Sequence, residues 1–233
     1  MNSYTLGAVF ARGGSKGVAR KNLRVLAGRP LVAHAVLAAL QVPELERVIV
    51  STDDDQIAEA AREAGAEVPF MRPAELATDE SPEWLSWQHA VRSLEAEGAA
   101  RISAMVSVPA TAPLRLPEDV SACVRELQGT DSDAVITVTP ATHHPSFNMV
   151  DMDEGGHLRL AAADNSRVVR RQDAPPLWNI TPVAYAIRRD FLLGASSLFD
   201  GKVRAVVVPP ERALDIDTEF DMRIAACLME DAP

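Results

Sequence analysis

Short strand-like apolar runs alternate with helix-like patterns along most of the chain. The run from Thr5 to Phe10 precedes a glycine-rich loop, and apolar residues then recur at helical spacing from Leu31 to Leu40, directly after Pro30. The alternation predicts further strands at 47–51, 102–108, 134–138, 183–187 and 203–208, and further helices at 54–64, 84–97, 117–127 and 218–229. Strands that alternate with helices of this length predict a mostly parallel sheet flanked by helices, in the α/β class.

The alternation breaks between about residues 140 and 180, where Pro, Asp and Arg are frequent and periodicity is weak. We interpret this stretch as an insertion within one domain that spans residues 1–233. A chain of this length suits a single domain. Its 47% hydrophobic and 24% charged residues exclude wholesale disorder.

Charge and cysteine content narrow the possible partners. The net charge of −10 disfavours nucleic acid or an anionic membrane as the main partner, because phosphate backbones bind basic surfaces. Cys123 and Cys227 are too few for a disulfide framework, and no window resembles a membrane span or a signal peptide. We therefore expect a cytoplasmic protein without a membrane or nucleic-acid partner. Six cations nevertheless cluster with no acid among them: Arg12, Lys16, Arg20, Lys21, Arg24 and Arg29.

The basic cluster coincides with the glycine-rich loop that follows the first predicted strand. Glycines at 13, 14 and 17 allow backbone N–H groups to turn toward an anion, and the neighbouring cations supply charge. The loop has neither the Walker A pattern nor GxGxxG. It is either a phosphate-binding loop or a solvated basic loop, and its place directly after an apolar strand favours phosphate binding.

A second polar segment, ALDIDT, lies near the C-terminus. Read as a strand, it places Asp215 and Asp217 on one face, about 7 Å apart, and Ile216 toward the core. Two such carboxylates can share a divalent cation. Alternatively, Asp217 or Thr218 caps the last helix, with Asp221 completing a capping box.

Two further polar segments follow or flank predicted strands. The STDDD turn at 51–55 is best explained as a helix N-cap with acids at the positive helix end. Arg72 begins a loop bracketed by Pro73 and Pro82, and its side chain either reaches a phosphate or lies on the surface. The glycine-rich loop, the STDDD turn, the PATAPLR segment and ALDIDT each follow a strand, so we expect all four to converge at one edge of the sheet.

Together, the stretches ARGGSKGVARKNLRVLAGRPL, RVIVSTDDDQIAEAAREAGAEVPFMRPAELATDESP, ATAPLR and ALDIDTEFDMRIA resemble the acylneuraminate cytidylyltransferase family, the CMP-sialic acid synthetases and their relatives for other nonulosonic acids. The resemblance implies a Rossmann-like, GT-A-like nucleotidyltransferase domain. It also implies a homodimer in which the insertion helps to complete the partner's active site. The implied reaction transfers CMP from CTP to a 2-keto-3-deoxy sugar acid and releases pyrophosphate, with Mg²⁺ or Mn²⁺ as the cofactor.

The same resemblance assigns roles to individual residues. The nucleotide phosphates would be held by Arg12, Gly13, Ser15, Lys16, Lys21 and Asn22. Further substrate contacts fall on Arg72, Ser81 and Thr111, and, in the insertion, on Arg171 and Gln172, within the subunit or across the dimer. The metal motif matches Asp215 and Asp217, and the catalytic set comprises Arg12, Lys16, Lys21 and Asp217.

The chain departs from the family on the acceptor side. Pro109 replaces the glutamine of the family's LLQPTSPLR, and the NGAIY segment becomes Thr181 to Tyr185 without its asparagine. We therefore expect an acceptor other than ordinary N-acetylneuraminate, such as a legionaminic- or pseudaminic-type acid, or a phosphonate. Two alternatives stay open at this stage, a GT-A-like glycosyltransferase and a non-catalytic nucleotide-binding protein. Pyrophosphate release from CTP would separate the first from the predicted enzyme, and CTP binding without turnover would favour the second.

Overall fold

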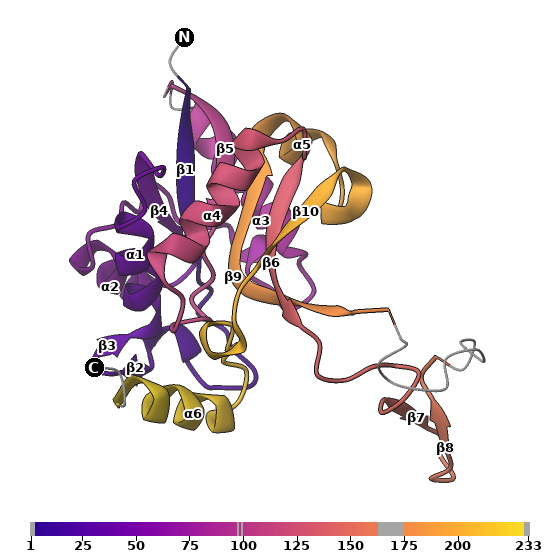
Figure 1. The fold of residues 1–233 in the computed structure, drawn as a ribbon. Helices are drawn as coiled ribbons and strands as arrows, with labels where there is room; N and C mark the ends of the chain where they lie inside the picture. Colours follow the sequence, from indigo (N-terminus) through magenta and orange to yellow (C-terminus); the bar gives the residue numbers. More distant parts are fainter. Residues whose placement is uncertain (1–2, 97, 99, 163–174, 231–233) are drawn as a thin grey trace.

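A computed structural model describes residues 3–96, 98, 100–162 and 175–230, and it has a central six-stranded sheet in the order β10-β6-β9-β5-β1-β4 (Figure 1). The strands of this sheet are β1 Ser3–Phe10, β4 Arg47–Ser51, β5 Arg101–Ser107, β6 Ala134–Pro140, β9 Trp178–Arg188 and β10 Val203–Val207. Strand β1 pairs in parallel with β4 and β5, and β10 pairs in parallel with β6. The predicted α/β class is therefore confirmed.

Helices cover both faces of the sheet (Figure 1). The α-helices are α1 Leu31–Leu40, α2 Asp55–Glu63, α3 Glu83–Ala96, α4 Pro117–Gly129, α5 Arg189–Gly194 and α6 Glu219–Glu230, and short 3₁₀ turns occur at Lys21–Leu23, Ala74–Leu76, Leu198–Asp200 and Pro210–Arg212. Apolar side chains of α1, α2 and α4 form one core cluster with the sheet, and those of α3 and α5 form a second. In the described part of the chain, no helix is long and apolar enough to cross a membrane.

Strand β9 departs from the parallel arrangement. It runs antiparallel to both of its neighbours, β5 and β6. The chain leaves β6 and returns to β9 through the insertion, whose described residues contain no helix, whereas parallel neighbours are usually joined through a crossover helix. The sheet is therefore mostly parallel, with one antiparallel strand near its middle.

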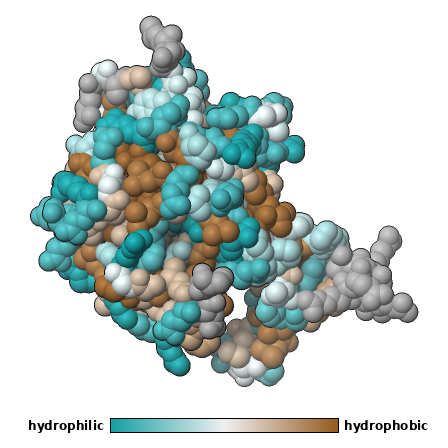
Figure 2. Space-filling view, turned by 60° about the vertical axis from the view of Figure 1, so that its left-hand side comes forward, coloured by the Kyte–Doolittle hydropathy of each residue, from teal (hydrophilic) through white to brown (hydrophobic). Residues whose placement is uncertain are grey.

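The insertion forms an arm that projects from the body between β6 and β9 (Figure 1). The arm carries an antiparallel hairpin of β7 Val150–Met152 and β8 Leu158–Leu160, which the sequence interpretation of residues 140–180 as irregular had missed. Apolar side chains on it are strongly exposed, with Met152 at 71% and Leu158 at 63%. Figure 2 shows this apolar surface on the projection at its lower right.

The C-terminal segment leads back under the sheet. Residues 213–217 form no strand, because the chain turns away from the sheet at the 3₁₀ turn Pro210–Arg212 and finds no neighbouring strand to pair with. The strand predicted for ALDIDT is therefore wrong. Helix α6 then packs near the small hairpin of β2 Val25–Leu26 and β3 Arg29–Pro30, so that Ile216 and Met222 share a core cluster with Val18 of the glycine-rich region.

Candidate active site

A cavity of about 460 Å³ opens at the edge of the sheet where β1 and β5 end. Its walls come from the glycine-rich loop after β1, the loop of residues 72–83, the turn after β5, the β9 segment and Asp217. Parallel strands place such loops together at their carboxyl ends. Most of the segments that the sequence singled out converge here, although they are far apart along the chain.

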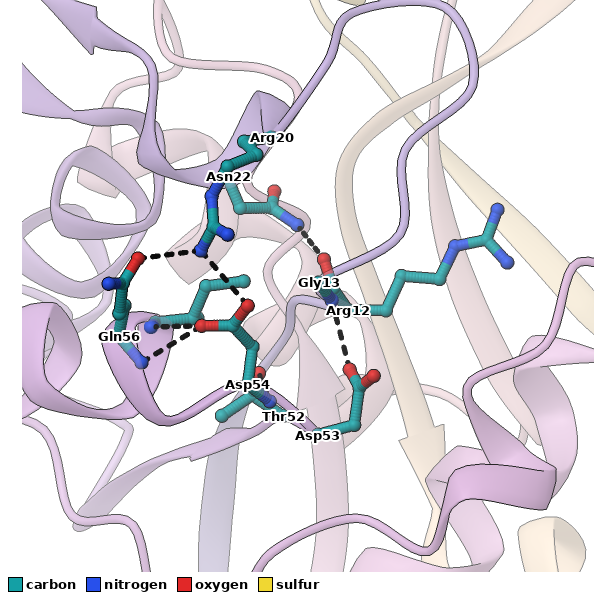
Figure 3. Close-up of polar contacts among 9 residues, drawn as sticks. Arg12, Gly13, Arg20, Asn22, Thr52, Asp53, Asp54 and Gln56 are labelled. Atoms are coloured by element: carbon teal, nitrogen blue, oxygen red, sulfur yellow. Dashed lines mark hydrogen bonds and ion pairs between the residues drawn. The ribbon is translucent and has the colours of Figure 1, made fainter.

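The glycine-rich loop contributes cations to this cavity. Arg12, Ser15 and Lys16 line it, whereas Gly13 does not. The Gly13 N–H instead donates to Asp53 Oδ1 at 2.9 Å, so this amide holds the loop rather than facing a ligand (Figure 3). The Arg12 side chain points away from these loop contacts (Figure 3).

The STDDD turn supports the loop from below. The Asp54 carboxylate accepts from the backbone N–H groups of Gln56 and Ile57 at 2.9 and 3.1 Å, which confirms the predicted N-cap of α2. Arg20 donates to the same carboxylate at 3.0 Å (Figure 3). Asn22 is buried, lines the cavity and donates from Nδ2 to the Arg12 carbonyl at 2.9 Å. These contacts fix the backbone from which Arg12 and Lys16 extend.

Lys21 joins the glycine-rich loop to the ALDIDT segment, which we call the DxD segment after Asp215 and Asp217. Its Nζ donates to the Ile216 carbonyl at 2.6 Å and to Asp217 Oδ1 at 3.0 Å. The two segments approach so closely that a Cβ on Gly17 would lie 2.0 Å from the Asp217 carbonyl oxygen. Glycine at this position therefore permits the contact.

The two DxD carboxylates occupy different environments. Asp217 lines the cavity, and its side chain is 70% exposed. Ile216, between the two aspartates, is buried and donates its N–H to the Thr111 carbonyl at 2.8 Å. One Asp215 oxygen, Oδ1, is buried and has no hydrogen-bond partner among the described residues. Burial raises the pKa of Asp215, the Thr111 side chain opposes that rise, and the charge of Asp217 adds to it.

Helix capping falls on the next residues. Thr218 and Asp221 bond reciprocally, because the Thr218 N–H donates to Asp221 Oδ2 at 2.7 Å and the Asp221 N–H donates to Thr218 Oγ1 at 3.3 Å. Asp217 is therefore free of the capping role. An orphaned carboxylate oxygen beside an exposed carboxylate suits a hard cation that prefers oxygen ligands. Within the described ranges, no three His, Cys, Asp or Glu side chains gather as a metal cage, so such an ion would draw further ligands from phosphate or water.

Asp79 belongs to the site although the sequence did not single it out. Its carboxylate pairs with Arg12 at 2.6 Å and with Lys16 at 2.9 Å, and it lines the cavity. The Lys16 ammonium, and then the Arg12 guanidinium, hold the pKa of Asp79 below its ordinary value. The residue lies in the Pro-bracketed loop, and only the path of that loop brings it to the basic cluster.

Arg72 and Ser81 both line the cavity. Arg72 is buried, which excludes the interpretation as a surface arginine, and its Nε donates to Ser51 Oγ at 3.1 Å. Its guanidinium carbon lies 5.7 Å from the centre of the Phe10 ring. Burial lowers the pKa of Arg72, while the Asp53 and Glu83 charges oppose that shift. Ser81 Oγ is buried with no partner in the described structure.

Glu83 and Tyr185 complete the wall, and neither was singled out as a site residue from the sequence. Burial raises the pKa of Tyr185 to about 12, and the Glu83 and Asp215 charges add to the shift. The positions of these side chains depend on how α3 and β9 meet the sheet, which no local motif signals. Of the other substrate-contact residues expected from the sequence, Thr111 lines the cavity, whereas Arg171 and Gln172 lie outside the described residues.

Comparisons with known proteins identify the fold and the family. Post-translational flagellin modification protein B of Campylobacter coli is 28% identical over 229 residues, which are 98% of this chain and 96% of the relative. CMP-N,N'-diacetyllegionaminic acid synthase of Campylobacter jejuni is 30% identical over 221 residues, 95% of this chain and 93% of the relative. CMP:2-keto-3-deoxy-manno-octonic acid synthetase, solved in complex with CTP, has the same fold, with a TM-score of 0.74 and 18% identity over 98% of this chain and 99% of that one.

The family itself is shown by a match of residues 6–182 to the family described as cytidylyltransferase. The resemblance inferred from the glycine-rich, STDDD, RPAELATDESP and ATAPLR stretches is thereby confirmed, and glycosyl transfer is set aside. The chain belongs to the cytidylyltransferase family and is an enzyme of the nucleotidyltransferase type.

Proposed function

We propose that this cytidylyltransferase transfers CMP from CTP to the anomeric hydroxyl of a nonulosonic sugar acid and releases pyrophosphate. The observation that carries the proposal is the convergence of Arg12, Lys16 and Lys21 on one cavity that also contains Asp217. Three cations beside an acidic motif match the needs of a triphosphate better than those of a neutral ligand.

In the proposed reaction the protein itself forms no covalent bond to the substrates. The acceptor hydroxyl oxygen bonds to the α-phosphorus and gives up its proton, while the bond from that phosphorus to the α,β-bridging oxygen breaks and pyrophosphate leaves. Arg12 and Lys16 would neutralise and orient the departing phosphates. Lys21, which donates to Asp217, would hold the glycine-rich loop and the DxD segment in their relative positions.

A divalent cation, Mg²⁺ or Mn²⁺, is part of the proposal. Asp215 and Asp217 would hold it, supported by the orphaned Oδ1 of Asp215 and the exposed carboxylate of Asp217. Bound there, the ion would supply positive charge to phosphate oxygens.

The acceptor is proposed as a legionaminic-type acid. Pro109 and Pro182, which belong to the segments that depart from the sialic acid enzymes, both line the cavity. The Campylobacter jejuni relative is named for the synthesis of CMP-N,N'-diacetyllegionaminic acid. Pseudaminic-type acids and phosphonates are the competing acceptors.

We also propose a cytoplasmic homodimer assembled through the arm. The exposed apolar side chains of β7 and β8 support this assembly, because an isolated hairpin of this size buries little of its own surface. In the dimer, Arg171 of the insertion would bind a substrate carboxylate or phosphate. A cytoplasmic setting supplies CTP and suits the two free cysteines.

Pyrophosphate release tests the reaction. The purified enzyme is incubated with CTP, Mg²⁺ and a panel that contains N,N'-diacetyllegionaminic, pseudaminic and N-acetylneuraminic acids and a phosphonate. The proposal expects the highest kcat/KM with the legionaminic-type acid. Release with a phosphonate alone would move the enzyme to another acceptor class, and CTP binding without release on any acceptor would point to a non-catalytic protein.

A Mg²⁺ titration tests the metal assignment. Asp217→Asn and Asp215→Asn keep side-chain size and remove the charge that a hard cation needs, so each should raise the Mg²⁺ concentration for half-maximal rate and lower kcat. Asp217→Asn should keep the free energy of unfolding within about 1 kcal/mol, because Thr218 provides the cap. Asp131→Asn, at an exposed pair with Lys202, is the matched control. Wild-type Mg²⁺ dependence in both DxD variants would place the metal elsewhere.

A further inference from the structure

We infer that Glu83 selects the base: its carboxylate accepts a hydrogen bond from the exocyclic amino group of cytosine and so discriminates CTP from UTP. This inference rests on the proposed binding of CTP in the cavity. It does not depend on which acceptor is used.

Glu83 is the first residue of α3 and lines the cavity. The charge that acts on its carboxyl is that of the Arg72 guanidinium, whereas Arg12 and Lys16 pair with Asp79. Glu83 therefore lines a part of the cavity distinct in chemistry from the phosphate-binding cations.

Phe10 and Tyr185 line the same cavity with flat rings, and the Arg72 guanidinium carbon lies 5.7 Å from the Phe10 ring centre. Each of these rings also packs at a tilt against Trp87, with ring centres 6.3 Å and 5.6 Å from the indole. Planar rings and a planar guanidinium suit a flat heteroaromatic ring rather than a puckered sugar.

The donors and acceptors of Glu83 and Arg72 complement the hydrogen-bonding edge of cytosine. Cytosine presents one amino donor, N4, beside two acceptors, N3 and O2. Glu83 offers only acceptors when it is ionised, while the neighbouring Arg72 offers only donors. Uracil would present its O4 acceptor to the carboxylate and its N3–H donor to the guanidinium, so both contacts would be unfavourable. A carboxylate also suits the neutral base better than it suits a triphosphate or a sugar acid.

Two further features support a ligand contact here. Glu83 is an exposed residue that lines the cavity, so its carboxyl is accessible to a ligand there. Burial raises the pKa of this carboxyl, and the positive charge of Arg72 opposes that rise and favours the ionised form that accepts hydrogen bonds. Ser81 Oγ, two residues earlier, lines the same cavity and is buried without a partner among the described residues.

Nucleotide binding without an acceptor tests the inference. The dissociation constants of CTP and UTP are measured by calorimetry for the wild type, Glu83→Gln, Glu83→Ala and the control Glu80→Gln, an exposed acid of the same loop that does not line the cavity. The wild type and the control should prefer CTP. In both Glu83 variants the ratio of the UTP to the CTP dissociation constant should fall about tenfold or more, since a charge-assisted hydrogen bond is lost.

The variants should differ in a second way. The amide that Glu83→Gln introduces can donate to uracil O4, so this variant should gain UTP affinity, whereas Glu83→Ala should mainly lose CTP affinity. Melting curves establish that each variant is folded before binding is compared.

An unchanged UTP to CTP ratio in both folded variants would overturn the inference. A wild-type enzyme that binds UTP as tightly as CTP would overturn it too. Because turnover is not measured in the binding arm, absence of pyrophosphate release would contradict the proposed function and leave this inference to be decided by the binding ratio alone.

Discussion

Lys16 lies at the mouth of the cavity, with 78% of its side chain exposed and an ion pair to Asp79. An exposed ion pair contributes little to folding, whereas a point charge on a triphosphate acts directly on the transition state. Lys16→Ala should therefore lower kcat/KM at least about 100-fold, which corresponds to about 2.7 kcal/mol, and leave the melting temperature nearly unchanged. Steady-state kinetics and a melting curve measure both quantities.

The matched control for this variant is Lys202→Ala, since Lys202 is similarly exposed and pairs with Asp131 far from the cavity. The control should keep full activity. If Lys16→Ala stayed active and lost stability, the basic loop would be structural rather than phosphate-binding.

Gly17 tests the contact between the glycine-rich loop and the DxD segment. A Cβ at this position would lie 2.0 Å from the Asp217 carbonyl oxygen, so Gly17→Ala must push the two segments apart. We expect kcat to fall at least about tenfold, because an ångström-scale displacement of a positioned group costs rate. Gly14→Ala is the control, since nothing lies within 4 Å of its Cβ position. Equal activity of the two variants would show that this close approach does not matter.

At this scale the sequence identified the cations better than the acids. Arg12, Lys16 and Lys21 were predictable because they follow a strand inside a recognisable loop. Asp79 was not, because its partners Arg12 and Lys16 are more than 60 positions away along the chain. Glu83 was not, because no local motif shows that the first residue of α3 lines the cavity. Gly13 does not line this cavity, and its N–H donates to the Asp53 carboxylate instead.

The loop of residues 72–83 acts as one element over the site, and Asp79 ties it to the basic cluster. CTP phosphates would compete with this carboxylate for Arg12 and Lys16. Asp79→Asn should therefore tighten the binding of pyrophosphate about two- to fivefold, the range set by an exposed ion pair. Calorimetry with pyrophosphate measures the effect, and Glu80→Gln is the control within the same loop.

The contact has a defined pH window. Because the Lys16 and Arg12 charges hold the pKa of Asp79 below its ordinary value, the contact is complete above that ordinary value and is lost only as the pH falls through the lowered one. The effect of Asp79→Asn should thus be the same at pH 6 and pH 8. Weaker pyrophosphate binding by Asp79→Asn would mean that the carboxylate supports the site rather than competing for it.

Elements were predictable where local periodicity decides them. Helices α1, α2, α3, α4 and α6 and the strands of the central sheet were predicted from the apolar pattern, since each buries one face or both against the core. The short helix α5 was not predicted. The strand predicted for ALDIDT was wrong although apolar and acidic residues alternate in it and Ile216 is buried. No neighbouring strand pairs with the segment to form a ladder. The arm hairpin β7–β8 was missed because its apolar side chains face outward, so no internal core shapes its sequence.

The exposed apolar hairpin of the arm indicates that the enzyme forms a homodimer. Met152 and Leu158 pair across the hairpin and are both mostly exposed, which suits burial against a second copy. The wild type should be a homodimer by light scattering at micromolar concentration. Met152→Asp combined with Leu158→Asp should give monomers with reduced activity.

A single substitution on the body, Phe199→Asp, is the control, because Phe199 is 64% exposed but lies away from the arm. A wild-type monomer with full activity would remove both the dimer and the cross-subunit role of Arg171.

The whole enzyme is acidic, with a net charge of −10, yet its proposed substrates are anions, so the account depends on the local cluster at the cavity. The most direct test follows the phosphorus that changes partners. CTP labelled at the α-phosphate is incubated with the enzyme, Mg²⁺ and N,N'-diacetyllegionaminic acid, and the products are separated. We predict that the label moves into a CMP-sugar acid while unlabelled pyrophosphate is released, and that ATP, GTP and UTP are poorer donors. Label that stays in CTP, or appears only as free CMP, would contradict it.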